Sequence, residues 1–193
     1  DSAPFNVRAD DAYVDANDNL SVTITGTSGA NYEAVSTSGT ISNSVVDDAD
    51  VTTLSLSASA SVSEGGTITY TASLTNPAET AMSVTLSNGA VINIIAGASS
   101  GNVSVAAPSD DVYIDAGSVS ATIASSSGGN FESLTTNPAA AATTITDTID
   151  TTSVTLSSAT AGSNVTEGGS IVYTATVDHL VTGTPLVVTL SNG

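Results

Sequence analysis

The chain repeats a set of short motifs at intervals of about 100 residues, and this repetition constrains its fold more than any other feature of the sequence. The paired motifs are Asp-Asp-x-Tyr-x-Asp at residues 10–15 and 110–115, Glu-Gly-Gly at 64–66 and 167–169, Val-Thr-Leu-Ser-Asn-Gly at 84–89 and 188–193, and Asn-Tyr-Glu at 31–33 with Asn-Phe-Glu at 130–132. Their order predicts the C-terminal half of one repeat at residues 1–50, a complete repeat at 51–150 and the N-terminal half of a third at 151–193. We call these the N-terminal, central and C-terminal segments. Because the chain starts within a repeat, and with Asp rather than Met, we expect it to be a piece of a longer protein.

Apolar and polar residues alternate along the central segment, which is the pattern of half-buried strands rather than helices. We predict strands at about residues 53–58, 67–75, 82–87, 90–96, 101–107, 118–125 and 142–147. Asn88-Gly89 between two of these runs is a hairpin signal. Seven short antiparallel strands predict an all-β fold, a tandem array of immunoglobulin-like antiparallel β-sandwiches of about 100 residues each.

The formal net charge is −18, with one Arg and no Lys. A surface of this sign repels nucleic acids and anionic membranes, and it favours bound cations. No run of 18 apolar residues and no signal peptide is present, so neither a membrane span nor direct membrane insertion is expected. The chain has no cysteine, and a small extracellular domain without disulfides needs another means of stabilisation, such as metal.

If successive strands run up and down, the loops after the first, third and fifth strands and the exit from the seventh meet at one pole of the sandwich. That pole collects Glu64, the acidic residues of 110–115, and the carboxylates of 147–150. With so few basic side chains, the compensating cation must come from solution, and oxygen ligands on loops suit Ca²⁺. The spacing is not that of an EF-hand, and more than one ion per junction is compatible with it. A solvated acidic loop is the alternative.

Several single residues have plainer interpretations. Tyr13 and Tyr113 alternate with acidic residues, so we expect their side chains to fill the sandwich core. We expect Arg8 on an exposed strand face. The chain lacks Cys, Lys and the usual nucleophile and phosphate-loop motifs, so we expect no enzymatic activity.

Three motifs in combination resemble the extender repeats of giant bacterial repeats-in-toxin adhesins, which are exported by type I secretion, and more distantly Calx-beta domains. These motifs are Glu-Gly-Gly after the first strand, Asp-Asp-x-Tyr-x-Asp after the fifth, and Asp-Thr-Ile-Asp between repeats. The resemblance implies a row of calcium-stabilised modules at the bacterial cell surface that hold a terminal ligand-binding region outward for adhesion or biofilm formation.

The resemblance also implies a set of Ca²⁺ ligands. They are Glu64, Asp110, Asp111, Asp115, Asp147 and Asp150 in the central segment, Asp10, Asp11, Asp15, Asp47 and Asp50 at the first junction, and Glu167 at the third. Asp18 has no acidic counterpart in the central segment, and the sequence leaves open whether it is a ligand.

The expected partners are neighbouring repeats of the same chain. One alternative function is that the repeats themselves bind a polysaccharide or a cell surface. Another is a calcium sensor. A third is that the two terminal half-repeats complete each other head to tail in a filament, although joining Gly193 to Asp1 leaves fewer residues than the central segment uses between Gly89 and Asn102.

Overall fold

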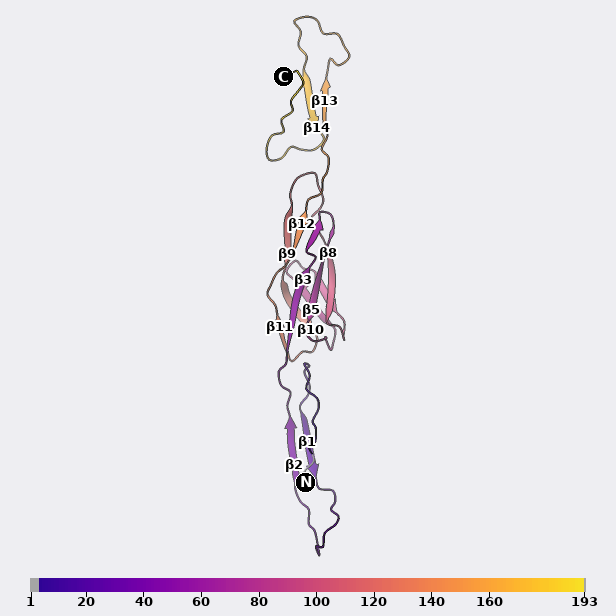
Figure 1. The fold of residues 1–193 in the computed structure, drawn as a ribbon, viewed down its shortest axis with the longest axis vertical. Helices are drawn as coiled ribbons and strands as arrows, with labels where there is room; N and C mark the ends of the chain where they lie inside the picture. Colours follow the sequence, from indigo (N-terminus) through magenta and orange to yellow (C-terminus); the bar gives the residue numbers. More distant parts are fainter. Residues whose placement is uncertain (1–3, 193) are drawn as a thin grey trace.

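The computed structural model describes residues 4–192 and shows three β-structured parts arranged along one long axis (Figure 1). The central segment is the widest part, and a two-stranded hairpin lies on either side of it. Residues 1–3 and 193, which end the two predicted half-repeats, lie outside the described residues. Among residues 4–192 there is no helix, and therefore none long and apolar enough to cross a membrane. The all-β prediction is confirmed.

One sheet of the central segment has four strands. Their order is β11 (Ser133–Thr136), β3 (Val51–Ala58), β5 (Thr67–Leu74) and β8 (Ser100–Ala106). The β3–β5 and β5–β8 pairs are antiparallel, whereas β11 runs parallel to β3. Side chains of β5 alternate between buried and half-buried or exposed positions, as the period-2 pattern of its sequence predicts.

The opposite sheet is built from two three-stranded groups. One group has the order β4 (Ser61–Ser63), β12 (Ala141–Thr146) and β9 (Gly117–Ala121), and the other has β10 (Ile123–Gly128), β6 (Met82–Leu86) and β7 (Val91–Ile94). Only Thr122 separates β9 from β10, so the two groups continue into one another. The chain changes sheets after β3, because β4 pairs in parallel with β12. The result is an immunoglobulin-like sandwich.

All seven predicted strands are present, with two differences. Residues 118–125 were predicted as one strand, but the structure has β9 and β10, with an irregular register between Ile123 and Ser125. The short strands β4 and β11 were not predicted. Both pair in parallel with strands distant in sequence, and neither is long enough to show an alternating pattern.

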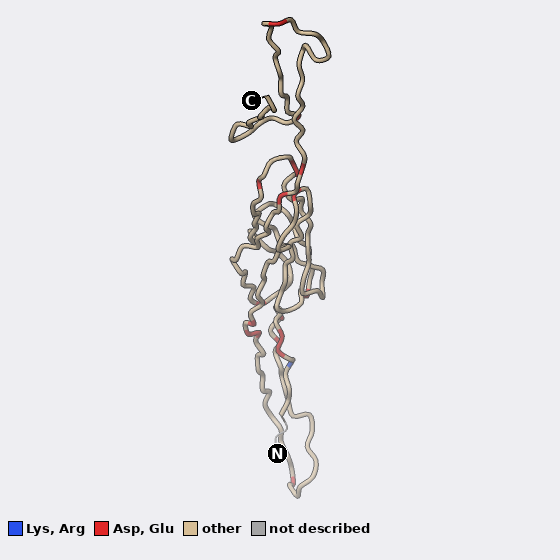
Figure 2. Tube along the Cα trace, turned by 45° about the horizontal axis from the view of Figure 1, so that its top comes forward, with Lys and Arg blue, Asp and Glu red and all other residues tan. Residues whose placement is uncertain are grey.

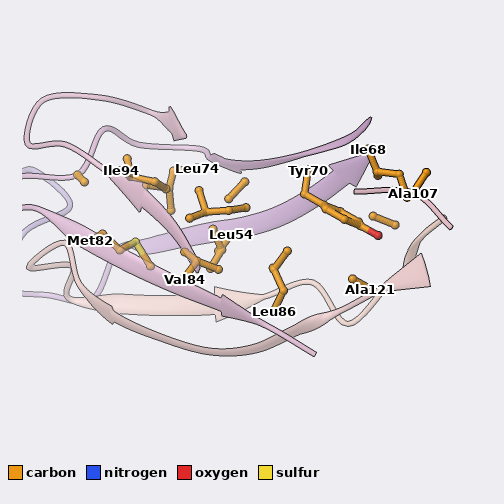
Figure 3. Close-up of a cluster of buried hydrophobic side chains, with 14 of the residues drawn as sticks. Leu54, Ile68, Tyr70, Leu74, Met82, Val84, Leu86, Ile94, Ala107 and Ala121 are labelled. Carbon is orange, nitrogen blue, oxygen red and sulfur yellow. The ribbon is translucent and has the colours of Figure 1, made fainter. Parts of the chain in front are cut away.

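Buried aliphatic side chains from both sheets fill the space between them (Figure 3). Leu54, Tyr70 and Val84 are completely buried. Tyr70 is the largest of the fully buried side chains, and its hydroxyl has no hydrogen-bond partner. The central segment thus has a core of its own.

The flanking segments are thinner. β1 (Asp18–Thr23) pairs with β2 (Thr40–Val45), and β13 (Val154–Ser158) pairs with β14 (Tyr173–Val177), both antiparallel. Within the described residues neither hairpin is covered by a second sheet, and Ile41 and Leu156 remain more than half exposed. The division of the chain into one whole and two half-repeats stays a prediction.

Candidate metal centre

Glu64, Asp115 and Asp147 converge where the central sandwich leads into the C-terminal segment. Figure 2 shows acidic residues gathered at this end of the sandwich. One carboxylate oxygen from each lies within 4.8 Å of the others. Glu64 follows β4, Asp115 precedes β9 and Asp147 follows β12, so the group joins three separate loops. The Glu64 N–H donates to the carbonyl of Thr146 at 3.1 Å, and the Asp115 N–H donates to Asp147 Oδ1 at 3.4 Å.

The Glu-Gly-Gly turn places Glu64 beneath the acidic loop. Gly65 has a φ of 66°, a conformation that favours glycine, and its N–H donates to the carbonyl of Pro108 at 2.7 Å. A Cβ on Gly66 would lie 2.6 Å from Val62 Cγ1 and 2.8 Å from the Ser63 carbonyl oxygen. Both glycines are therefore required by the backbone path that brings Glu64 to the cluster.

Glu64 is the one acidic residue buried in the described part of the chain, with 6% of its surface exposed. Its Oε2 atom is buried without a hydrogen-bond partner. A hydrogen bond with Asp115, burial, and the charges of Asp115, Asp147 and Asp111 raise the pKa of Glu64 to about 7. A buried carboxylate oxygen without a partner is costly, and a cation would satisfy it and remove the repulsion between neighbouring carboxylates.

The other predicted ligands of the central segment lie around this group without joining it. Asp110 Oδ1 accepts a hydrogen bond from the Thr148 hydroxyl, and Asp111 Oδ1 accepts one from the Tyr113 N–H at 2.7 Å. Asp111 is close enough for its charge to contribute to the raised pKa of Glu64. Asp150 is exposed in the link to the C-terminal segment and is not part of the three-carboxylate group.

The acidic residues of the first junction are arranged differently, and among the described residues they form no comparable group of three carboxylates. Asp11 Oδ1 accepts a hydrogen bond from the Tyr13 N–H at 2.9 Å, and Asp15 and Asp47 contact Arg8. A hydrogen bond with Asp48, together with the charges of Asp48 and Asp50, raises the pKa of Asp10.

Glu132 also belongs to this first junction, and it is not among the predicted ligands. Its Oε2 accepts a hydrogen bond from the Asp50 N–H at 2.6 Å. That hydrogen bond lowers the pKa of Glu132, but burial and the charges of Asp47, Asp48 and Asp50 outweigh it and raise the pKa. Placing the repeats end to end would have revealed this residue, because the far pole of one repeat faces the acidic pole of the repeat before it.

Glu167 lies in an exposed turn of the C-terminal segment, where the Gly169 N–H donates to the Thr166 carbonyl at 2.9 Å. The equivalent turn of the central segment has the same hydrogen bond, in which the Gly66 N–H donates to the Ser63 carbonyl. In the described part of the chain, Glu167 joins no carboxylate group.

The expectation that Tyr13 and Tyr113 fill the core is wrong. The Tyr113 hydroxyl donates to the carbonyl of Leu180, and the Tyr13 hydroxyl donates to the carbonyl of Pro77, both at 2.8 Å. Each tyrosine therefore reaches the segment that follows its own. The reason is local: residues 110–115 form a loop rather than a strand, so alternation does not decide which way the side chain points.

Comparison with known proteins gives one family. Residues 50–148 and residues 150–193 each match the LapA domain, and LapA is a large cell-surface adhesin of biofilm formation. No curated protein and no solved structure matches the chain. An adhesin-type domain on an all-β fold favours a non-enzymatic structural protein. Since the two matches together cover well over half of the sequence, the chain belongs to the LapA domain family.

Proposed function

We propose that this chain is a calcium-stiffened extender segment of a large bacterial surface adhesin, which holds a terminal ligand-binding region away from the cell. The observation that carries the proposal is the buried Glu64 carboxylate, one oxygen of which has no partner, beside Asp115 and Asp147. Membership of an adhesin domain family and the arrangement of the segments in a row support it. The protein would then act outside the cell, as a repeats-in-toxin adhesin exported by type I secretion.

Calcium suits this site better than other common cations. All the side chains that converge are carboxylates, which are hard oxygen ligands, and they lie on loops. Ca²⁺ takes six to eight oxygen ligands in a flexible geometry, which loops can supply. Mg²⁺ demands a compact octahedral arrangement and gives up its water reluctantly. Asp110, Asp111 and Asp150 are further candidates for ligands in the central segment.

A cation at this point would tie the start of the link to the central sandwich. Asp147 follows the last strand of the sandwich and leads directly into the link to β13, while Asp115 and Glu64 belong to the sandwich itself. Binding all three to one ion fixes the start of the link. Without the ion, the like charges repel one another and favour an open, mobile link.

The length of the strands sets the reach of each segment. β3 and β5 have 8 residues each, and strands of that length span roughly 27 Å at the usual rise per residue. A row of such segments gains a few nanometres per repeat, on the same rise. Keeping that length useful requires stiff junctions, and this is the role that we assign to calcium.

Thermal unfolding tests the proposal. We expect a large rise of Tm in millimolar Ca²⁺ over chelator, and a much smaller rise in Mg²⁺. Glu64→Gln should lose most of the calcium effect, whereas Glu33→Gln, at an exposed position in the N-terminal segment, should retain it. An equal rise in the Glu64→Gln protein, or no rise in the unaltered chain, would rule out calcium binding at this site.

A second candidate function is head-to-tail assembly, in which one copy's N-terminal hairpin and another copy's C-terminal hairpin complete a sandwich. The exposed Ile41 and Leu156 side chains on the two hairpins favour it. Light scattering during size-exclusion chromatography should then show a mass that grows with protein concentration, and a constant monomer mass would exclude such assembly.

A further inference from the structure

Arg8, the only Arg or Lys of the chain, lies among acidic residues at the first junction, so the expectation that it lies on an exposed strand face is wrong. Its Nη2 lies 2.7 Å from Asp47 Oδ1, its Nε 3.5 Å from Asp15 Oδ2 and its Nη1 3.9 Å from Asp18 Oδ2. Nη1 also donates to the carbonyl of Ala16. The Arg8 side chain is half-buried, with 24% of its surface exposed, and its guanidinium contacts three carboxylates and a carbonyl.

Two of these carboxylates are the repeat equivalents of the candidate metal ligands. Asp15 corresponds to Asp115 and Asp47 to Asp147, each 100 residues apart. Their geometry is also equivalent, because the Asp15 N–H donates to Asp47 Oδ2 at 3.0 Å, as the Asp115 N–H donates to Asp147. The guanidinium of Arg8 therefore contacts the repeat equivalents of Asp115 and Asp147, two of the three carboxylates that would hold the ion at the second junction.

Two of the positions that differ between the two junctions belong to this ion-pair group. At the position of Arg8 the central segment has Pro108, and at the position of Asp18 it has Ser118. Neither can form the ion pair. Asp18, one of the acidic residues that have no acidic counterpart in the central segment, is thus a partner of Arg8.

We propose that Arg8 replaces the metal ion at the first junction, so that successive junctions in this chain are held by different cations. The inference rests on the proposed calcium site of the central segment. A guanidinium keeps its charge at all physiological pH values and can form directed bonds to several oxygens at once. Its charge also repels a divalent cation from the same carboxylates. The first junction is then held together without calcium, whereas the second responds to it.

Counting bound calcium on the full chain tests this inference. Isothermal titration with Ca²⁺ should show about one additional ion in Arg8→Gln, because Asp15, Asp18, Asp47 and the Ala16 carbonyl are then free to bind it. Arg8→Lys keeps the charge and should bind no additional ion. Amide chemical shifts of Asp15 and Asp47 that move with calcium only in Arg8→Gln would locate the new ion.

The outcomes separate this inference from the proposed function. If Arg8→Gln binds no more calcium than the unaltered chain, while Glu64→Gln binds less, Arg8 does not replace an ion and the central site stands. If Glu64→Gln binds as much calcium as the unaltered chain, the central site fails and the inference fails with it. Combining Glu64→Gln with Arg8→Gln should leave the new site at the first junction.

Discussion

At the scale of single residues, Glu64 is the carboxyl group whose charge is most disfavoured by burial and by neighbouring acidic residues in the central segment. It is buried, lies beside Asp115 and Asp147, and has a pKa of about 7 instead of the usual value near 4.5. Without a bound cation the folded state therefore favours the protonated form. Calcium binding favours the ionised form. Protons and calcium therefore compete for the Glu64 carboxyl group, and calcium should bind more weakly as the pH falls.

This coupling predicts the pH dependence of stability in chelator. Because the pKa of Glu64 is higher in the folded chain than in the unfolded chain, its stabilising contribution is complete below about pH 4.5 and is lost as the pH rises through about 7. Comparing Tm between pH 4.5 and 8 should show the unaltered chain losing stability relative to Glu64→Gln. Parallel curves for the two proteins would contradict the raised pKa.

Tyr70 offers a second prediction at this scale. Its hydroxyl is buried without a hydrogen-bond partner, which is unfavourable compared with a phenyl ring of the same shape. Tyr70→Phe should therefore leave the central segment as stable or raise its free energy of unfolding by about 1 kcal/mol. Urea unfolding measures the change. If the free energy of unfolding falls by more than about 1 kcal/mol, the Tyr70 hydroxyl makes a hydrogen bond in the folded protein, and the prediction is wrong.

At the scale of elements, the sequence predicts what is local and misses what depends on distant pairing. β5 and β6 follow from the alternation of apolar and polar residues alone. β4 and β11 could not be predicted, since each exists only because a strand far away in sequence lies beside it.

The sequence likewise predicts part of the candidate site and misses part of it. Alternating strand direction predicts that Glu64, Asp115 and Asp147 come from loops at one pole, and the structure brings these three together. The pattern does not predict which of the six expected ligands stay outside, because Asp110 and Asp111 are already engaged by Thr148 and by the Tyr113 N–H.

The tyrosine contacts lead to a prediction about the second junction. Tyr113→Phe removes the hydrogen bond to the Leu180 carbonyl but keeps the ring. The C-terminal hairpin should become more mobile, while the Tm of the central segment should stay nearly unchanged, because the contact lies outside its core. Backbone ¹⁵N relaxation across β13 and β14 would detect the change, with Tyr32→Phe, at an exposed position, as the control. Unchanged relaxation would show that this contact does not restrain the hairpin.

At the scale of the whole molecule, a chain with a net charge of −18 is arranged as a single row of segments, so repulsion between acidic residues acts at the junctions. Like charges gather where segments meet, and we propose that each junction needs a cation to remain stiff. In our account calcium serves at the second junction and Arg8 at the first. The chain then has one junction whose stiffness follows the calcium concentration and one whose stiffness does not.

The most direct measurement of the central claim is the distribution of distances across the second junction. The chain has no cysteine, so Ser104→Cys on β8 and Thr174→Cys on β14, both exposed, provide two unique positions for spin labels. Double electron–electron resonance should give a narrow distribution in Ca²⁺ and a broad one in chelator or Mg²⁺. Equally narrow or equally broad distributions in all three solutions would contradict calcium stiffening.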